Sequence, residues 1–186
     1  MIHCDLKPQN FLIFYNESEN ESDNRTNGEF ISDDVSVTSY DPNSFVKISD
    51  FGFSHIIPYG DTKAYMKYKT GTFSYTAPEI ANVYSNYLKT QDCYIDQSVD
   101  IWSFGLSLYQ MAVAYLPTAI KDYRYGKFQL LKNIFKGTGP IPFRKVDWKN
   151  FDFVNLKNLI DSCMESDPAK RISAEDALNH VWFDSF

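Results

Sequence analysis

The strongest constraint on the fold is a series of short motifs that follow one another in a fixed order along the 186 residues. The chain reads HCDLKPQN at 3–10, DFG at 50–52, APE at 77–79, DIWSFG at 100–105 and DPAKRI at 167–172. Any one triplet recurs by chance. About twenty matched positions do not, because each further position lowers the probability of a chance match by roughly a factor of 15 to 20 at average composition. The order of the motifs therefore restricts the chain to one architecture.

Together with GTFSY at 71–75 and HVWF at 180–183, these motifs resemble the Ser/Thr branch of the eukaryotic protein kinase family. The resemblance implies an α+β fold, namely a mostly helical C-terminal lobe with a small β-hairpin at the active site. We expect residues 1–183 to form this lobe in part, from the catalytic loop onward. The small lobe, with its Gly-rich loop, is expected to be absent.

The resemblance also implies roles for five residues near the start of the chain. Asp5 would accept the proton of the substrate hydroxyl, and Lys7 would contact the transferred phosphate. Asn10 and Asp50 would hold Mg²⁺, because amide and carboxylate oxygens suit a hard cation. ATP would be the phosphate donor, bound by these groups together with Leu12, which resembles the residue beneath the adenine ring.

The segment 71–75 resembles the loop that docks the protein substrate. Its expected functional residues are Gly71, Thr72 and Tyr75. Thr72 after Gly71, and Lys7-Pro8 in the catalytic loop, are typical of family members that phosphorylate serine and threonine. We therefore expect a protein substrate that offers a Ser or Thr hydroxyl.

Other residues have structural roles by resemblance. Glu79 and Arg171 are expected to form a buried ion pair, and Asp100 to hold the catalytic loop from the start of a central helix. His3 and Phe51 resemble two members of the apolar stack that links the lobes of the family.

Two departures from the family pattern concern regulation and specificity. Cys4 replaces the arginine that usually pairs with a phosphate on the activation segment, and a thiol offers no bidentate cation. We therefore predict activity that does not require phosphate on that segment, at Thr62, Tyr65, Tyr68, Thr70 or Thr72. Gln9 and Gln110 stand where kinases that prefer basic peptides commonly carry glutamate, so we predict no strong preference for arginine upstream of the phosphorylated residue. The subfamily stays open.

Two apolar runs, 11–14 and 45–48, predict paired strands that would bring Asn10 and Asp50 together. Between them, residues 16–44 are rich in Asn, Ser, Asp and Glu, so we expect a disordered acidic insertion. This insertion holds eight acidic residues and one arginine, a charge of −7 against −6 for the whole chain. The remainder therefore carries only +1, which argues against nucleic acid as a partner.

The absence of charge over 101–120 suits either a buried helix or a membrane span. Ser103, Ser107 and Gln110 interrupt the apolar run, and the motif at 100–105 favours the buried helix. We therefore expect a core helix over 101–116 and no membrane association.

Two further helices are predicted near the C-terminus. The first stops near 167–168, and its apolar face recurs at i, i+3, i+4, i+7 and i+8. That face consists of Leu156, Leu159, Ile160, Cys163 and Met164. The second begins with the capping pair Ser173 and Asp176. The residues of this helix expected to face the core are Ala177, Leu178 and Val181.

The three cysteines have no close spacing, which fits reduced thiols better than disulfides. We therefore expect a cytoplasmic or nuclear protein.

Three interpretations remain open on the sequence alone. The first is the catalytic region of a Ser/Thr kinase with Asp5 as base. The second is a truncated, inactive kinase-like binding protein, and the third is a gene model started too late. Without a small lobe we expect the isolated chain to be inactive or very weak, and its exposed large-lobe face to need a partner that covers it.

Overall fold

The computed structural model describes residues 1–15, 44–66, 71–80, 93–113 and 151–185. It divides into two compact units, one of Met1–Asn10 with Asp50–Phe186 and the other of Phe11–Ser49. The expected acidic insertion over 16–44 lies outside the described residues, apart from Ser44.

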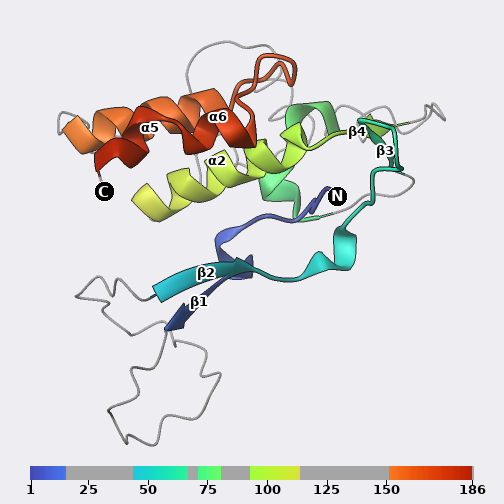
Figure 1. The fold of residues 1–186 in the computed structure, drawn as a ribbon, viewed down its shortest axis with the longest axis horizontal. Helices are drawn as coiled ribbons and strands as arrows, with labels where there is room; N and C mark the ends of the chain where they lie inside the picture. The colour runs from blue at the N-terminus through green and yellow to red at the C-terminus, as the bar shows by residue number, and fades with distance from the viewer. Residues whose placement is uncertain (16–43, 67–70, 81–92, 114–150, 186) are drawn as a thin grey trace, which may run out of the picture. The chain divides into compact units, whose positions relative to one another are not determined.

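The smaller unit is an antiparallel hairpin of β1 (Phe11–Tyr15) and β2 (Ser44–Ile48), shown in Figure 1. Phe14 and Phe45 face each other across the pair, and their rings stack at 5.5 Å. The ammonium nitrogen of Lys47 lies 4.9 Å from the centre of the Phe14 ring. Cross-strand aromatic and cation–π contacts of this kind stabilise a hairpin. The strands predicted from the two apolar runs are therefore confirmed.

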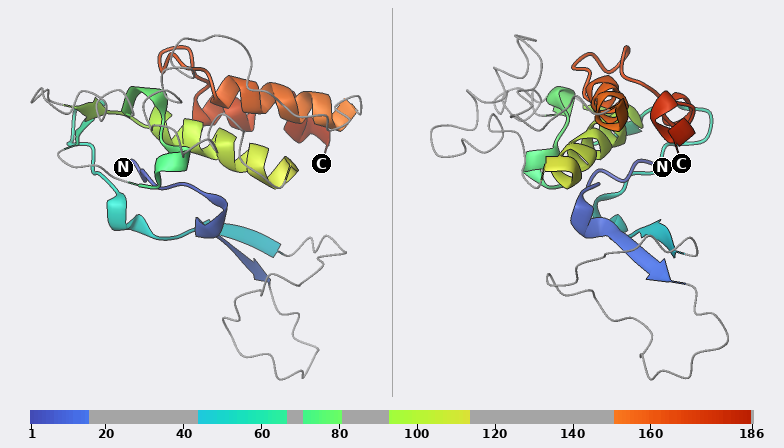
Figure 2. Two further views of the ribbon diagram at one scale, coloured as in Figure 1. Left: turned by 180° about the vertical axis from the view of Figure 1, so that it is seen from behind. Right: turned by 90° about the vertical axis from the view of Figure 1, so that its left-hand side faces the viewer.

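The larger unit is built around helices α2 (Ser98–Val113) and α5 (Phe151–Cys163), which lie side by side in Figure 1 and Figure 2. The expected core helix thus begins at Ser98, and residues 114–116 lie outside the described residues. Gly105 allows the close crossing, because a Cβ there would lie 2.6 Å from the Cβ of Cys163. None of the helices in the described ranges is long and apolar enough to cross a membrane.

The apolar faces of both helices form the core. Helix α2 contributes side chains with at most 3 % of their surface exposed, namely those of Val99, Trp102, Leu106 and Tyr109. Helix α5 and the residue after it contribute the buried side chains of Leu159, Ile160, Cys163 and Met164. Leu156 is partly exposed and packs against this core. The predicted helical face is therefore confirmed.

The last helix is shorter than its sequence pattern suggests. Helix α6 covers only Ala174–Leu178, and the capping pair is present, since the Ser173 hydroxyl accepts the backbone N–H of Asp176 at 3.0 Å. Of the three residues expected to face the core, Ala177 is buried, but Leu178 is 73 % exposed and Val181 is 46 % exposed. The prediction for those two was wrong. Leu178 is still helical, but it lies about 100° around the helix from the buried Ala177. The helix ends at Leu178, so its period is broken before Val181. Trp182 and Phe183, on the 3-10 helix η5 (Val181–Ser185), pack against the core instead.

A second short antiparallel pair joins β3 (Ala64–Tyr65) to β4 (Tyr94–Ile95). Its buried members, Ala64 and Ile95, pack into the core of the larger unit. The described residues thus combine helices with two small antiparallel sheets, which is an α+β fold.

Candidate active site

The backbone of the loop that begins the chain is fixed by Asp100, in the first turn of α2. Its two carboxylate oxygens accept the backbone N–H groups of His3 at 2.7 Å and Cys4 at 2.8 Å. Cys4 has a left-handed conformation with φ of 65°. Successive N–H groups around such a residue form a concave site for an anion. Burial raises the pKa of Asp100, and these two hydrogen bonds oppose that rise. The predicted tie between Asp100 and the loop is confirmed.

Asp5, Lys7 and Thr72 form one hydrogen-bonded cluster. The Lys7 ammonium donates to Asp5 Oδ2 at 2.8 Å and to Thr72 Oγ1 at 2.9 Å. The Thr72 backbone N–H donates to the other Asp5 oxygen, Oδ1, at 2.7 Å. Both oxygens of the Asp5 carboxylate are thereby oriented by donors that lie 2 and 67 residues away in the chain. The structure thus brings together three of the residues that the sequence singled out.

The electrostatics of the cluster favour the ionised form of Asp5, although its side chain is buried. Burial raises the pKa of Asp5, but hydrogen bonds from the side chain of Lys7 and from the hydroxyl and backbone N–H of Thr72 lower it below the usual value. The carboxylate therefore stays an acceptor at neutral pH, ready to hold the proton of a hydroxyl that approaches it.

Asn10 lies beside the same carboxylate, at the end of the 3-10 helix η1 (Pro8–Asn10). Its amide nitrogen donates to the Asp5 backbone carbonyl at 2.8 Å and lies 3.4 Å from Asp5 Oδ2. These contacts assign the NH₂ end of the buried amide to Asp5, so that the other end is an oxygen, the atom type that Mg²⁺ prefers.

Asp50 follows directly after the residues of the hairpin unit. It has a left-handed conformation, with φ of 62° and ψ of 71°, and its exposed carboxylate caps the 3-10 helix η2 (Phe51–Phe53) through the Gly52 N–H. The ring of Phe51 contacts that of His3 edge-on at 4.9 Å, while the membership of both residues in a stack that links two lobes stays a prediction. The expected proximity of Asp50 to Asn10 stays a prediction. Leu12 belongs to β1 in the other unit, so its place under an adenine ring also stays a prediction.

The residues described here contain no group of three or more His, Cys, Asp or Glu side chains arranged to hold a metal ion. The expected pair is smaller, with one amide oxygen from Asn10 and one carboxylate from Asp50. Mg²⁺ keeps several of its waters and usually takes only one or two protein ligands, so the chemistry of this donor pair fits it.

Gly71 and Tyr75 frame the Thr72 side of the cluster. Gly71 has φ of 77°, and a Cβ there would lie 2.0 Å from the carbonyl oxygen of Cys4, so that only glycine fits. Thr72 precedes the 3-10 helix η3 (Phe73–Tyr75) and accepts the Tyr75 N–H at 2.9 Å. The buried Tyr75 donates its hydroxyl to the side-chain oxygen of Gln110 on α2.

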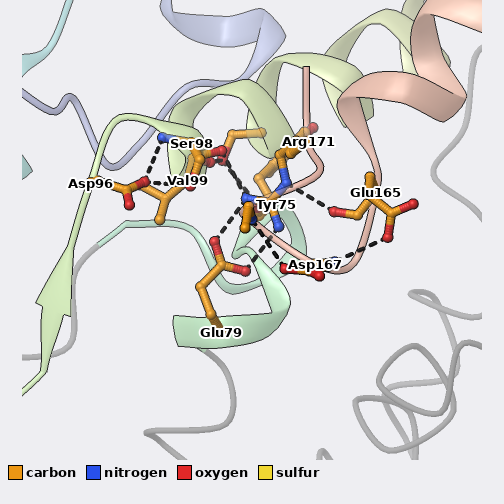
Figure 3. Close-up of polar contacts among 10 residues, drawn as sticks. Tyr75, Glu79, Asp96, Ser98, Val99, Glu165, Asp167 and Arg171 are labelled. Atoms are coloured by element: carbon orange, nitrogen blue, oxygen red, sulfur yellow. Dashed lines mark hydrogen bonds and ion pairs between the residues drawn. The ribbon is translucent and has the colours of Figure 1, made fainter. Parts of the chain in front are cut away.

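Glu79 and Arg171 form the predicted ion pair, shown in Figure 3. The guanidinium is bidentate, with Nη1 at 2.7 Å from Oε1 and Nη2 at 2.9 Å from Oε2. Its remaining donors reach the backbone carbonyls of Glu165 at 2.9 Å and Ser98 at 2.8 Å. The Arg171 side chain is fully buried and lies over the Trp102 ring, whereas Glu79 keeps 26 % of its side chain exposed. The prediction of an ion pair is confirmed, with one of its members buried.

Cys4, the first departure from the family pattern, contacts His55. The Cys4 sulfur lies 3.7 Å from Nδ1 of His55, so this position contacts the following segment through a thiol and an imidazole. The predicted independence from phosphate stays a prediction, and Tyr68 and Thr70 lie outside the described residues.

Sequence reasoning did not anticipate the contact between Tyr75 and Gln110 or the buried hydroxyl of Ser103, which donates to the Tyr75 carbonyl at 2.8 Å.

Comparison with known proteins gives the geometry a family. Residues 1–183 match the family described as protein kinase domain. The chain is 31 % identical over 181 residues to calcium-dependent protein kinase 3 of Plasmodium berghei, covering 97 % of this chain and 25 % of that protein. It is 30 % identical over 181 residues to calcium/calmodulin-dependent protein kinase type I of Schizosaccharomyces pombe, covering 97 % and 42 % respectively. It is also 31 % identical over 189 residues to the serine/threonine-protein kinase cds1 of the same yeast, covering 97 % and 31 %. The chain thus spans less than half the length of these curated relatives, and it belongs to the protein kinase domain family.

Proposed function

We propose that this chain is the catalytic region of a Ser/Thr protein kinase that transfers the γ-phosphate of ATP to Ser or Thr hydroxyls of a protein. The names of its relatives support this reaction, since each is a protein kinase and one is named as a Ser/Thr kinase. Residues 1–183 would form the C-terminal lobe in part, with residues 16–44 as an acidic insertion and the β1–β2 hairpin at the active site. Its reduced cysteines favour the cytoplasm or nucleus.

The observation that carries the proposal is the Lys7 ammonium, which bridges Asp5 and Thr72. In this arrangement Asp5 acts as the base that accepts the proton of the attacking hydroxyl. Lys7 is placed to neutralise charge on the transferred phosphate, because phosphoryl transfer depends mainly on positioning and electrostatic stabilisation. Gly71, Thr72 and Tyr75 present the docking side, and Thr72 links that side to the base.

ATP and Mg²⁺ are the cofactors that the family uses in general. Asn10 and Asp50 are the groups that would hold the metal, which would neutralise phosphate charge when bound. Leu12 would contact the adenine. The chain's own residues then have two tasks, to orient the hydroxyl at Asp5 and to keep this carboxylate ionised through Lys7 and Thr72.

A second candidate, a kinase-like binding protein without activity, is favoured by one observation. Four apolar side chains of the larger unit are strongly exposed around the start of the chain and η2, at 60 % for Met1, 49 % for Phe51, 43 % for Phe53 and 80 % for Ile56. Exposed apolar surface of this kind favours a covering partner. In this case the partner would be a protein, with neither nucleic acid nor membrane involved.

The test separates these two functions by measuring binding and transfer independently. Calorimetry with ATP and Mg²⁺ should show binding by the chain, abolished in Asp50→Ala and retained in Asp184→Ala, an exposed carboxylate on η5. Transfer of radiolabelled phosphate to a library of Ser and Thr peptides should then be lost in Asp5→Asn with binding retained. Because the isolated chain is expected to transfer phosphate very weakly or not at all, ATP binding decides between the two functions. No binding of Mg²⁺-ATP by a folded chain would contradict the enzyme and favour the binding protein.

A further inference from the structure

We propose that Ser103 is a positioning residue for phosphate transfer, because its hydroxyl holds the η3 turn and through it keeps Thr72 against Asp5. The inference rests on the proposed function where it concerns the reaction, but its structural part can be tested without activity. Ser103 lies on α2 and is only 6 % exposed. It falls within the run DIWSFG at 100–105, but the motif gave it no role in the reaction.

The first link of this arrangement joins α2 to η3. The Ser103 hydroxyl lies 2.8 Å from the Tyr75 carbonyl oxygen and 3.1 Å from the Val99 carbonyl oxygen in its own helix. A hydroxyl has one proton to donate, and the shorter distance assigns it to Tyr75. The contact joins residues 28 positions apart in the chain, so it fixes one element against another.

The second link runs from Tyr75 to the reacting carboxylate. The Tyr75 N–H donates to the Thr72 carbonyl at 2.9 Å, and the Thr76 hydroxyl reaches the same oxygen at 3.3 Å. Thr72 in turn donates its N–H to Asp5 at 2.7 Å and accepts the Lys7 ammonium at its hydroxyl. A shift of the η3 turn would therefore move both groups that Thr72 presents to the cluster.

Helix α2 also holds Asp5, the residue that Thr72 contacts. Asp100, three residues before Ser103, binds the backbone N–H groups of His3 and Cys4, which directly precede Asp5. Positions i and i+3 lie on one face of a helix, so adjacent turns of α2 hold Asp5 from one side and Thr72 from the other. The spacing between the carboxylate and Thr72 is then set by a rigid helix, and Ser103 is its link to the docking side.

A matched control is available on the next turn of α2. Ser107 is also buried, with 0 % exposed, and its hydroxyl donates to the Ser103 carbonyl within the helix at 2.8 Å. Ser103→Ala and Ser107→Ala therefore delete the same group from two buried positions of the same helix. Only the former removes a contact with η3. If Ser103 merely fills space, the two substitutions should have equal effects.

The first measurement is hydrogen exchange of the Thr72 and Tyr75 amides in the full chain, followed by nuclear magnetic resonance. In Ser103→Ala we expect exchange of both amides to be about tenfold faster relative to that of Leu106, as for the loss of about one hydrogen bond. Ser107→Ala should leave the ratio unchanged. Ser103→Cys, which nearly keeps the volume but is a weak donor, should repeat the loss if the alanine variant does not fold. Equal ratios in both serine variants would overturn the proposal.

The second measurement concerns the reaction. With Mg²⁺-ATP and a Ser/Thr peptide library, kcat of Ser103→Ala should fall about tenfold while the KM for ATP is unchanged. Ser103→Thr, which keeps a hydroxyl, should restore it. If Ser107→Ala lowers kcat as much as Ser103→Ala does, the positioning role is contradicted. If the folded, unmodified chain neither binds Mg²⁺-ATP nor transfers phosphate, the proposed function fails, while the exchange measurement still decides whether Ser103 holds Thr72.

Discussion

Replacement of Arg171 by lysine keeps the positive charge beside Glu79 but removes the planar fork that the site uses. The guanidinium makes four hydrogen bonds through three nitrogens, two to the Glu79 carboxylate and one each to the carbonyls of Glu165 and Ser98 (Figure 3). A lysine ammonium has one nitrogen and cannot reach acceptors on both sides of the fork. The Glu165 carbonyl, which is bonded by Nε, necessarily loses its donor.

The cost follows from these contacts. An acceptor left without its partner away from water costs about 1 to 3 kcal/mol, and a second bond to a carboxylate is worth about 1 kcal/mol or more. For the Glu165 carbonyl and one bond to Glu79, we expect Arg171→Lys to lower the free energy of unfolding by about 2 to 4 kcal/mol. For a chain of this length, each kcal/mol lowers Tm by about 2 to 4 °C, so the melting temperature should fall by about 5 to 15 °C.

Urea unfolding followed by circular dichroism measures this loss, with Lys170→Met as the matched control. Lys170 lies next in the chain, but its ammonium is 3.7 Å from Asp167 and its side chain is 74 % exposed. A surface pair of this kind contributes about 0 to 1 kcal/mol, so the control should leave the unfolding midpoint nearly unchanged. If Arg171→Lys costs less than about 1 kcal/mol, or no more than the control, the argument from the guanidinium fork is refuted.

Three other predictions follow from single features. Gly105→Ala should destabilise the chain by about 1 to 2 kcal/mol in urea, since overpacking against Cys163 outweighs the helix propensity gained; an unchanged midpoint would show that the helices yield. Burial raises the pKa of Cys163 to about 12. At pH 8 iodoacetamide should therefore label the half-exposed Cys4 at least about a hundredfold faster than Cys163, as followed by mass spectrometry. Equal labelling rates of the two cysteines in the native chain would contradict this. In Lys7→Met, the pKa of Asp5 should rise, because fewer hydrogen bonds then oppose the effect of burial. Nuclear magnetic resonance titration should show Asp5 becoming protonated at higher pH than in the unmodified chain. An unchanged titration would contradict this.

The sign of the pH effect on stability follows from the direction of the Asp5 shift. Because the folded-state pKa of Asp5 is lowered, its contribution to stability is present above the pKa of the unfolded chain and is lost as pH falls through the folded-state pKa. Asp100 acts in the opposite sense, since burial raises its pKa and its contribution falls as pH rises between the unfolded and folded values. The Lys7→Met titration therefore tests Asp5 directly, whereas the acid stability of the whole chain does not.

Sequence reasoning succeeded where a motif implies a pair of residues at distant positions. The ion pair of Glu79 with Arg171 joins residues 92 positions apart, and the tie from Asp100 to His3 joins residues 97 apart. Periodicity alone could not have found either contact, because it describes only one element at a time. The strands and the apolar face of α5 needed no resemblance, since their apolar patterns match the periods of a strand and a helix.

The error at the C-terminus arose because apolar periodicity does not show where a helix ends. The expectation for Val181 extended a helical period beyond Leu178, the last residue of the helix. The stop lies at Asn179, whose side chain and backbone both bind the Glu175 carbonyl, and asparagine is a residue that competes with helix in this way. The polar residue was visible in the sequence, but apolar spacing was given more weight than the local competition.

The residues that made α2 look imperfect as an apolar helix are those that connect it to the site. Ser103 and Gln110 were interruptions in an uncharged run, and they argued only against a membrane span. In the structure they follow Asp100 at i+3 and i+10, beside the buried stripe of the helix, and bind the Tyr75 carbonyl and hydroxyl respectively. A buried polar group is costly unless it is paired, so each polar residue on an otherwise apolar helix implies a hydrogen-bond partner, which Ser103 and Gln110 find on another element. The sequence could therefore have indicated that α2 holds polar contacts. Only the fold could show that these contacts fix Thr72 against Asp5.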